Sequence, residues 1–356
     1  MRGLYTATVL ETVSRHFASR RKTGPLDIGK AFDLIAGTST GGILAAALAA
    51  GVPLSRVVGL YREEGPRIFT NPMPSNPVGI GWWVVRNWLR AANTNVHLKK
   101  TLEGFFNGET LDGLYQRRGI GLCIPAVRAE THSAKIFKTP HLDRFTRDRH
   151  HKISNVCLAT SAAPLYLPIA QFDHPEDATQ QCSFADGGLW ANNPILVGVL
   201  EALEIVGTTR RPIEVLSVGT CSVPDSCVIL PGKGSWGTFD WRFGAKTTVL
   251  SMNAQADGHA SMARLLADRL RALGQPITVV RFATRTRSPN EMKHMALDRA
   301  HSAALQCLTQ AAVDDAETAI RLCDGGGAST HETAMISSIF SNAPVHQQPA
   351  ESNKPT

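Results

Sequence analysis

A serine in a glycine-rich turn is the residue of this sequence best suited to chemistry. An apolar segment, 31–36, precedes the turn, and a Gly/Ala-rich segment, 43–50, follows it. Strand, tight turn and helix in this order form a nucleophile elbow, the G-x-S-x-G turn that places a serine hydroxyl at a helix N-terminus. The turn reads Gly37-Thr38-Ser39-Thr40-Gly41-Gly42. The sequence therefore predicts Ser39 as a nucleophile.

The glycines and the helix fit this interpretation. Gly37 and Gly41 flank the strained turn, and the missing side chains let the strand and helix backbones pass closely. The helix N-terminus offers unpaired N–H groups and partial positive charge, which would stabilise an oxyanion. The alternative is a glycine-rich turn in which Ser39 only caps the helix.

A serine nucleophile needs a base. His259, His294 and His301 all fall in helical patterns, which is typical of surface histidines. Asp186 is the better candidate because it begins Asp186-Gly187-Gly188 at the end of a short apolar run, where the glycines allow close approach to the backbone. Asp-Gly-Gly alone is only a turn signal. Together with the elbow it predicts a Ser39–Asp186 dyad.

The surrounding pattern alternates strands and helices. We expect buried strands at 120–127 and 213–218 and helices at 4–18, 195–203, 245–272 and 295–322. Asn193 and Pro194 are expected as N-cap and first residue of the helix at 195. Such alternation predicts an α/β fold whose mainly parallel central sheet is covered by helices on both faces. An α/β-hydrolase does not fit, because only 30 residues precede Ala31 and that fold needs several strands before its elbow.

Residues 66–96 differ from the rest of the chain. Four prolines interrupt them, and the strongly apolar run Val78-Gly79-Ile80-Gly81-Trp82-Trp83-Val84-Val85 follows. This segment is either a lid or membrane-facing element, or ordinary core packing of two tryptophans. The sequence does not separate the two interpretations.

The composition of the 356 residues is that of a folded protein, with 43% hydrophobic and 19% charged residues. No apolar run of 18 or more residues and no signal-peptide pattern occurs. The seven cysteines form no C-x-x-C pair, so neither a metal site nor a disulfide framework is expected. These features predict a cytoplasmic protein without a metal or other cofactor.

The formal net charge of +7 favours an anionic partner such as membrane lipid, a nucleotide or nucleic acid. Most of the excess is scattered, and the one dense stretch, 144–152, is typical of a solvated loop. The charge therefore assigns no binding site, and nothing in it points specifically to nucleic acid.

Four motifs in order resemble the patatin-like phospholipases. They are the elbow at 37–42, Ala159-Thr160-Ser161-Ala162-Ala163-Pro164, Asp186-Gly187-Gly188-Leu189 with Asn192-Asn193-Pro194, and Ser217-Val218-Gly219-Thr220. The resemblance implies a three-layer α/β/α domain, which we expect at 1–323, followed by a polar, disordered tail at 324–356. It also implies an acyl hydrolase of the phospholipase A or lysophospholipase type. In such an enzyme Ser39 would attack the ester and Asp186 would act as the general base. The enzyme would act on membrane phospholipid from the surface of the membrane.

One family element is incomplete. Patatin-like enzymes begin with a strand and a D-G-G-G-x-R-G loop whose N–H groups form the oxyanion hole, and here only Arg2 and Gly3 of that loop remain. We therefore expect the first strand to be absent from this chain and the true start to lie roughly 20 residues upstream. Losing one oxyanion donor typically costs about 100- to 1000-fold in rate.

The chain is similar, more loosely, to the phospholipase effectors of bacterial antiphage signalling (CBASS) systems. The segments that carry this likeness are Arg2–Ala7 and Leu48–Leu54. It implies a cyclic dinucleotide activator, for which the sequence offers no nameable binding motif, and it leaves an oligomer open. The alternatives are an ungated lipid acyl hydrolase, or a catalytically silent binding protein that keeps the fold.

Overall fold

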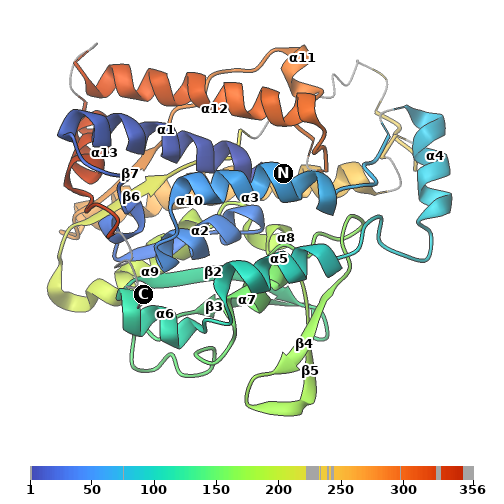
Figure 1. The fold of residues 1–356 in the computed structure, drawn as a ribbon, viewed down its shortest axis with the longest axis horizontal. Coiled ribbons are helices and arrows are strands. Elements are labelled where there is room, and N and C mark those ends of the chain that lie inside the picture. The colour runs from blue at the N-terminus through green and yellow to red at the C-terminus, as the bar shows by residue number, and fades with distance from the viewer. Residues whose placement is uncertain are drawn as a thin grey trace, which may run out of the picture.

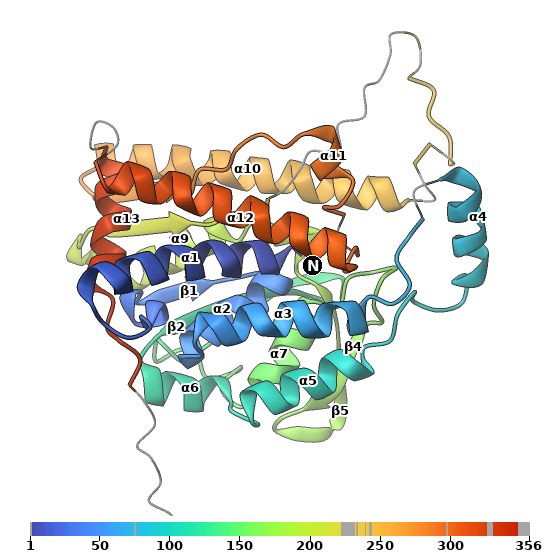
Figure 2. The same cartoon turned by 45° about the horizontal axis from the view of Figure 1, so that its top comes forward.

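A computed structural model describes residues 2–74, 76–221, 232, 234–238, 240–241, 244–296, 298–325 and 330–347. Two layers of helices enclose the strands (Figures 1 and 2). The side chains of the short strand β1 (Leu34–Ala36) show how the two layers are divided, because successive side chains of a strand point to opposite faces of the sheet. Ile35 packs into the main core, whereas Leu34 and Ala36 pack into a separate cluster.

The first layer contains the helices that share the main core with Ile35. Helix α1 lies along α12 in both views (Figures 1 and 2), and α2 and α7 contact the strands. The bounds in this layer are α1 (Gly3–Arg21), η1 (Ile28–Ala31), α2 (Thr40–Ala50), α3 (Leu54–Ile68), α5 (Val96–Phe106), α6 (Leu111–Arg118), α7 (Ile153–Thr160), α12 (Ser302–Cys323) and α13 (His331–Asn342).

The second layer covers the opposite face of the strands. Its helices are α8 (Gly188–Ala191), α9 (Ile195–Val206) and α10 (Ala245–Ala272), of which α9 contacts β1 and α10 packs on α8 and α9. The remaining short elements are α4 (Pro77–Arg86), η2 (Gly207–Thr209) and α11 (Pro289–Met292). Helix α4 lies at the periphery of the molecule in both views (Figures 1 and 2).

The strands form two sheets. In the larger sheet, β2 (Gly121–Arg128) pairs in parallel with β1 and antiparallel with β3 (Ser133–Lys138) and β5 (Asp177–Asp186), and β4 (Ala170–His174) pairs antiparallel with β5. In the smaller sheet, β6 (Ile213–Ser217) and β7 (Ile277–Arg281) are parallel. The pairing is therefore mixed rather than mainly parallel, because β2–β3 and β4–β5 are hairpins and hairpin strands are antiparallel.

Strands β1 and β5 meet end to end along one edge of β2. The register pairs Ala36, the last residue of β1, with Cys123, and pairs Asp186, the last residue of β5, with Ala126. Strand β3 occupies the other edge of β2 over the same residues. The carboxyl ends of two strands that approach from opposite directions are thus separated only by the span between Cys123 and Ala126.

Within the described residues, β1 has no strand partner except β2, and β6 has none except β7. A cavity separates these two edges and is lined by Leu34 and Ala36 of β1 and by Ile213, Val215 and Ser217 of β6. The edges of β1 and β6 that face this cavity are therefore unpaired among the described residues.

The predicted helices and strands are largely present, with three differences. Residues 324–356 were expected to form a disordered tail, but His331–Asn342 form helix α13, which buries Phe340 completely against the core. A stacked contact between Phe17 and Phe340 fixes this helix to α1. The helix predicted at 295–322 begins only at Ser302. Helix α9 begins at Ile195, with Pro194 as its N-cap residue instead of Asn193.

Candidate active site

The turn after β1 has the strained backbone of a nucleophile elbow. Ser39 has φ 56° and ψ −130°, a backbone conformation that residues other than glycine rarely adopt, and α2 begins at the next residue. A Cβ on Gly37 would lie 2.2 Å from the carbonyl oxygen of Gly41, and one on Gly42 would lie 2.8 Å from Thr160. The close approach thus requires glycine at 37 and 42. A Cβ on Gly41 would meet nothing, so the predicted packing role of Gly41 is wrong.

Thr160 connects the elbow to the Asp186 turn. Its Oγ1 accepts a hydrogen bond from the Ser39 N–H at 2.9 Å and donates one to the Pro125 carbonyl at 2.6 Å. Its own carbonyl accepts the Gly187 N–H at 3.2 Å. Thr160 is completely buried, so these bonds do not compete with water. Thr160 lies in a motif that is recognisable in the sequence, but its role could not be predicted there, because a hydrogen-bonding threonine has no spacing signature.

Asp186 accepts a hydrogen bond from Ser39 Oγ at 2.6 Å through Oδ2. Its Oδ1 accepts the Gly188 N–H, also at 2.6 Å. Gly187 must be glycine, since a Cβ there would lie 2.2 Å from the Pro125 carbonyl oxygen. Both carboxylate oxygens are therefore fixed, and the carboxylate is 3% exposed.

Burial raises the pKa of Asp186 to about 6, although the hydrogen bonds from Ser39 and Gly188 act in the opposite direction. A carboxylate with this pKa is ionised at neutral pH and is still a stronger base than an exposed aspartate. The Ser39 hydroxyl already donates a hydrogen bond to this base, and Ser39 lies at the N-terminus of α2. The pair can transfer a proton from serine to aspartate as the serine oxygen attacks a carbonyl carbon.

The other predicted residues of the elbow also lie at this site. Thr38 Oγ1 donates to the Ala191 carbonyl at 2.7 Å, which fixes the elbow to the second helical layer. Thr40 Oγ1 accepts the Gly3 N–H at 3.2 Å. Arg2 lines the same pocket as Ser39, and its Nε donates to the Met295 carbonyl at 3.3 Å. The structure thus brings Arg2 and Gly3 to the elbow.

Ser39 and Asp186 open into a mainly apolar pocket. Side chains of α2, α3, α5, α10 and the loop after α7 contribute to it. The apolar residues that line it are Ile43, Leu60, Ile68, Phe69, Leu98, Leu102, Leu165, Leu167, Leu189, Val249 and Met252. Contributions from α5 and α10 could not be predicted from motifs, because any amphipathic helix carries such residues. A pocket of this character suits a hydrocarbon chain.

The histidines lie elsewhere. In the part of the chain that the structure describes, Asp186 is the side chain that hydrogen-bonds Ser39 Oγ. His259 lies in α10 as expected, but His294 lies in a turn and His301 is the N-cap of α12, where it accepts the Ala304 N–H. These two assignments to helical patterns are therefore corrected, and neither histidine lines the pocket.

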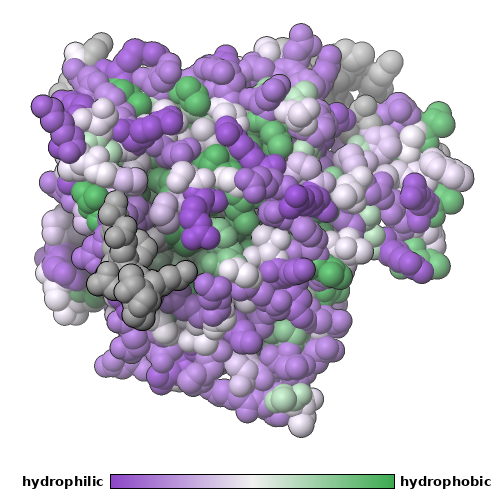
Figure 3. All heavy atoms as spheres, viewed as in Figure 1, coloured by the Kyte–Doolittle hydropathy of each residue, from purple (hydrophilic) through white to green (hydrophobic). Residues whose placement is uncertain are grey.

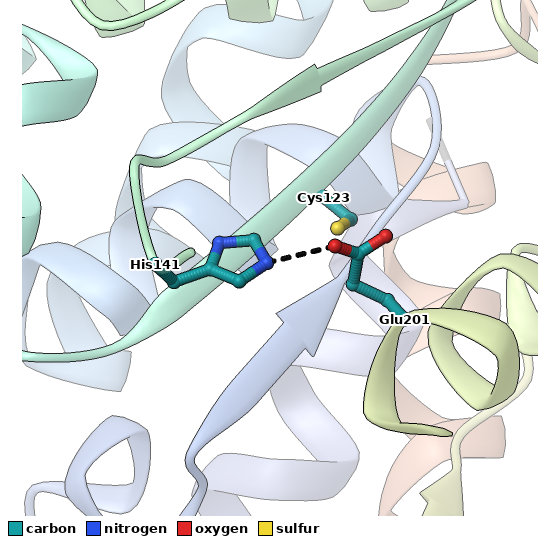
Figure 4. A group of neighbouring side chains, drawn as sticks. All are labelled: Cys123, His141 and Glu201. Atoms are coloured by element: carbon teal, nitrogen blue, oxygen red, sulfur yellow. Dashed lines mark hydrogen bonds and ion pairs between the residues drawn. The ribbon is translucent and has the colours of Figure 1, made fainter. Parts of the chain in front are cut away.

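One cluster of metal-ligand types occurs among the described residues, formed by Cys123, His141 and Glu201 (Figure 4). His141 Nε2 bonds one oxygen of Glu201 at 2.9 Å, and the Lys138 ammonium pairs with the other. Burial raises the pKa of the Cys123 thiol, so it is protonated at neutral pH. An ammonium group and a protonated thiol both disfavour a cation, and none of the three ligand residues lines the Ser39 pocket.

Several residues of the dense basic stretch at 144–152 form ion pairs or are buried. Arg144 pairs with Glu204, and Arg149 pairs with Asp112 at 3.0 Å. His151 is buried, and burial lowers its pKa to about 4. The stretch is thus less solvated than the sequence predicts, and its charges are partly neutralised.

Comparison with known proteins places the chain in a family. A sequence model described as "Patatin-like phospholipase" matches residues 1–199. A "cGAMP-activated phospholipase" from Pseudomonas aeruginosa (strain BWHPSA011 / Pa011) is 37% identical over 72% of this chain and 73% of the relative. Proteins of the same description from Vibrio cholerae and Escherichia coli (strain TW11681) are 32% and 31% identical, over 73% of this chain and 73% and 71% of the relatives. The chain belongs to the patatin-like phospholipase family.

Proposed function

We propose that this protein is a serine acyl hydrolase that cleaves ester bonds of membrane glycerophospholipids through a Ser39–Asp186 dyad. The single observation that carries the proposal is the 2.6 Å hydrogen bond between Ser39 Oγ and Asp186 Oδ2, both of which line an apolar pocket. Membership in the patatin-like phospholipase family supports the substrate class. In this proposal Arg2 lines the pocket, the Gly3 N–H bonds Thr40, and Gly37 and Gly42 allow the close packing of the elbow.

Acylation begins when Ser39 Oγ attacks the ester carbonyl carbon and its proton passes to Asp186 Oδ2. The tetrahedral oxyanion is stabilised by the N-terminus of α2, where the Thr40 N–H is among the first amides that lack an intrahelical acceptor. The C–O bond to the alcohol then breaks. The leaving lysophospholipid takes the proton from Asp186, and the acyl group remains on Ser39.

Deacylation uses the same groups in reverse. Asp186 takes a proton from water, and the resulting hydroxide attacks the acyl carbon. When the bond to Ser39 Oγ breaks, Asp186 returns the proton to this oxygen and the fatty acid leaves. Because the pKa of Asp186 is about 6, the carboxylate is available as a base at neutral pH in both half-reactions.

The pocket supports a long acyl chain as the part of the substrate that is bound. Its lining is mainly aliphatic, with Thr101 and Glu64 at the α3–α5 side. In the described part of the chain no helix is both long and apolar enough to cross a bilayer. Access to membrane phospholipid is therefore proposed to occur peripherally, from the surface of the membrane.

A cyclic dinucleotide is proposed as the activator. Three relatives at 31–37% identity are described as cGAMP-activated phospholipases, and the similarity covers 71–73% of their lengths. The net charge of +7 is compatible with an anionic activator. No residues of this chain are assigned to the nucleotide.

The proposal is tested by fatty-acid release from phospholipid vesicles, measured with and without a panel of cyclic dinucleotides that includes cGAMP. Parent protein is compared with Ser39→Ala and Asp186→Asn. Release that requires Ser39, Asp186 and one nucleotide is expected. Positional analysis of the lysophospholipid then distinguishes the A1, A2 and lysophospholipase types.

The two alternatives give different results in the same assay. Release that is independent of every nucleotide but requires Ser39 would identify an ungated acyl hydrolase. No release under any condition, together with retained folding, would favour a binding protein. Release that persists in Ser39→Ala would contradict the dyad.

A further inference from the structure

Helix α4 and the turn after it expose an unusual amount of apolar surface. The exposed fractions are 85% for Val78, 71% for Trp82, 65% for Val85, 75% for Trp88 and 89% for Leu89. Val78, Trp82 and Val85 lie at helical spacing on one side of α4, and Trp88 and Leu89 lie in the turn that follows the helix. Figure 3 shows hydrophobic residues at the outer edge of this region. These five residues are called the α4 face below.

The opposite side of α4 fixes the helix to the protein. Ile80 and Trp83 are 4% and 6% exposed, and Trp83 Nε1 donates to the Asn71 carbonyl at 3.3 Å. Asn71 Nδ2 in turn donates to Asn87 Oδ1 at 3.2 Å. Of the two adjacent tryptophans, Trp83 is therefore core and Trp82 faces outward. The core-packing interpretation of this segment is therefore confirmed for Trp83 and wrong for Trp82.

The charged residues of the segment that contains the α4 face, 65–102, are all basic. The chain contains no Asp or Glu between Glu64 and Glu103. The basic residues in this interval are Arg67, Arg86, Arg90, Lys99 and Lys100, all exposed. Arg86, Arg90 and the two lysines form no ion pair with any described residue. Unpaired cations beside exposed tryptophan and aliphatic side chains are complementary to an anionic lipid surface.

The α4 face is connected on both sides to residues that line the Ser39 pocket. The chain enters α4 from Ile68 and Phe69 and reaches Leu98 after it, and all three line the pocket. After the turn, the Ala92 N–H donates to the Leu165 carbonyl at 2.9 Å and the Asn93 N–H donates to the Tyr166 carbonyl at 3.0 Å. Leu165, which lines the pocket, is itself 45% exposed.

We propose that the α4 face inserts into the interfacial region of an anionic phospholipid bilayer and holds the pocket mouth against it. This inference rests on the proposed function, since it assigns the docking element of a membrane-active hydrolase. Trp82 and Trp88 would lie at the level of the headgroups, where indole rings are favoured, and Arg86 and Arg90 would contact lipid phosphates. The hydrogen bonds to Leu165 and Tyr166 then place the pocket beside the site of insertion.

The test uses flotation with vesicles of phosphatidylglycerol and phosphatidylcholine, carried out in the Ser39→Ala background so that no lipid is consumed. The test variant is Trp82→Ser/Leu89→Ser, neither of which lines the pocket. The matched control is Leu265→Ser/Leu273→Ser near the C-terminal end of α10, where the two leucines are 58% and 74% exposed. We expect vesicle binding to fall at least about tenfold in the test variant and less than about twofold in the control.

The same substitutions in the active protein give a second measurement. Fatty-acid release from vesicles should fall with binding, whereas hydrolysis of a soluble short-chain ester should not change. Arg86→Gln/Arg90→Gln should weaken binding to anionic vesicles and leave binding to pure phosphatidylcholine unaltered.

Equal vesicle binding by parent and test variant, or an equal loss in the control, would overturn the inference. A change from dimer to monomer in sedimentation, without loss of vesicle binding, would assign the face to a second copy of the chain and also overturn it. Failure of the proposed function is separate: it would appear as ester hydrolysis that is absent or independent of Ser39, while flotation still reports on docking.

Discussion

Ser39 Oγ donates a 2.6 Å hydrogen bond to Asp186, although the two residues are 147 positions apart in the chain. The relationship follows from strand register, because β1 and β5 end opposite Cys123 and Ala126 on the same edge of β2. Thr160 then bonds the backbone after each strand, at Ser39 and at Gly187. The dyad is therefore positioned by the sheet and by one buried threonine.

Catalysis should decrease below pH 6. The folded pKa of Asp186 is raised to about 6 from 3.8, so the base becomes protonated as the pH falls through 6. We expect kcat/KM for a soluble ester to fall about tenfold per pH unit below this value. A pH–rate profile between 4.5 and 8, restricted to conditions in which circular dichroism shows folded protein, measures the effect. A profile that stays flat down to about pH 4.5 would mean that Asp186 is not the base.

The raised pKa of Asp186 affects stability in the opposite direction: activity should rise with pH, whereas the contribution of this group to stability should fall. Between about pH 4 and 6 the folded protein binds the proton of Asp186 more tightly than the unfolded chain, so this group stabilises the fold less as the pH rises. Asp186→Asn removes the buried charge and should be at least as stable as the parent at pH 8. Urea denaturation at pH 8 measures this, and a large destabilisation would indicate that the ionised carboxylate is itself required by the fold.

Thr160→Val is expected to affect the reaction, measured as kcat, more strongly than it affects the free energy of unfolding. The substitution keeps the shape but removes the acceptor for the Ser39 N–H and the donor to Pro125. We expect a loss of about 10- to 100-fold in kcat with little change in KM, because misplacement of the nucleophile affects the reacting geometry. The matched control is Thr139→Val, a fully buried threonine whose Oγ1 accepts the Leu122 N–H at 2.8 Å. Equal losses of kcat in both variants would contradict a positioning role.

The elbow glycines should differ in their tolerance of alanine. Gly37→Ala would place a Cβ 2.2 Å from a backbone oxygen, so a loss of at least about 3 kcal/mol in the free energy of unfolding is expected. Gly41→Ala meets no atom within 4 Å and lies in the first turn of α2, so a change within about 1 kcal/mol is expected. Chemical denaturation of both variants measures the contrast, and similar losses would show that the close approach at Gly37 does not exist.

Asp315 should be essential for the packing of α1 against α12. It accepts the Tyr5 hydroxyl at 2.5 Å and pairs with Arg287, and all three side chains are buried. Asp315→Ala would leave the Arg287 cation buried without its partner, which typically costs about 3–5 kcal/mol. The neighbouring Asp314→Ala removes solvent-exposed contacts with Arg285 and Gln310 and should cost less than about 1 kcal/mol. A small effect of both substitutions would rule out the buried pair as a determinant of this packing.

The sequence predicts the local features of this fold well and the pairing of strands poorly. Residues 245–272 were predicted as a helix with the observed bounds, because apolar spacing carries that information. The antiparallel β4–β5 pair and helix α13 were missed, since β5 is mostly exposed and polar and the short apolar side of α13 lies within a polar tail. Ser39 and Asp186 were predicted from motifs, and the apolar run at 78–85 was recognised as either exposed or core. The hydrogen bonds of Thr160 and the side of α4 that is buried depend on tertiary contacts that the sequence pattern does not encode.

The most direct test of the dyad is mass spectrometry after reaction with a long-chain alkyl fluorophosphonate, which loses fluoride when an activated serine attacks phosphorus. The account predicts one adduct per chain, on the peptide that contains Ser39. It also predicts no adduct in Ser39→Ala and a rate at least about 100-fold lower in Asp186→Asn. Labelling of a different residue, or unchanged labelling in Asp186→Asn, would contradict it.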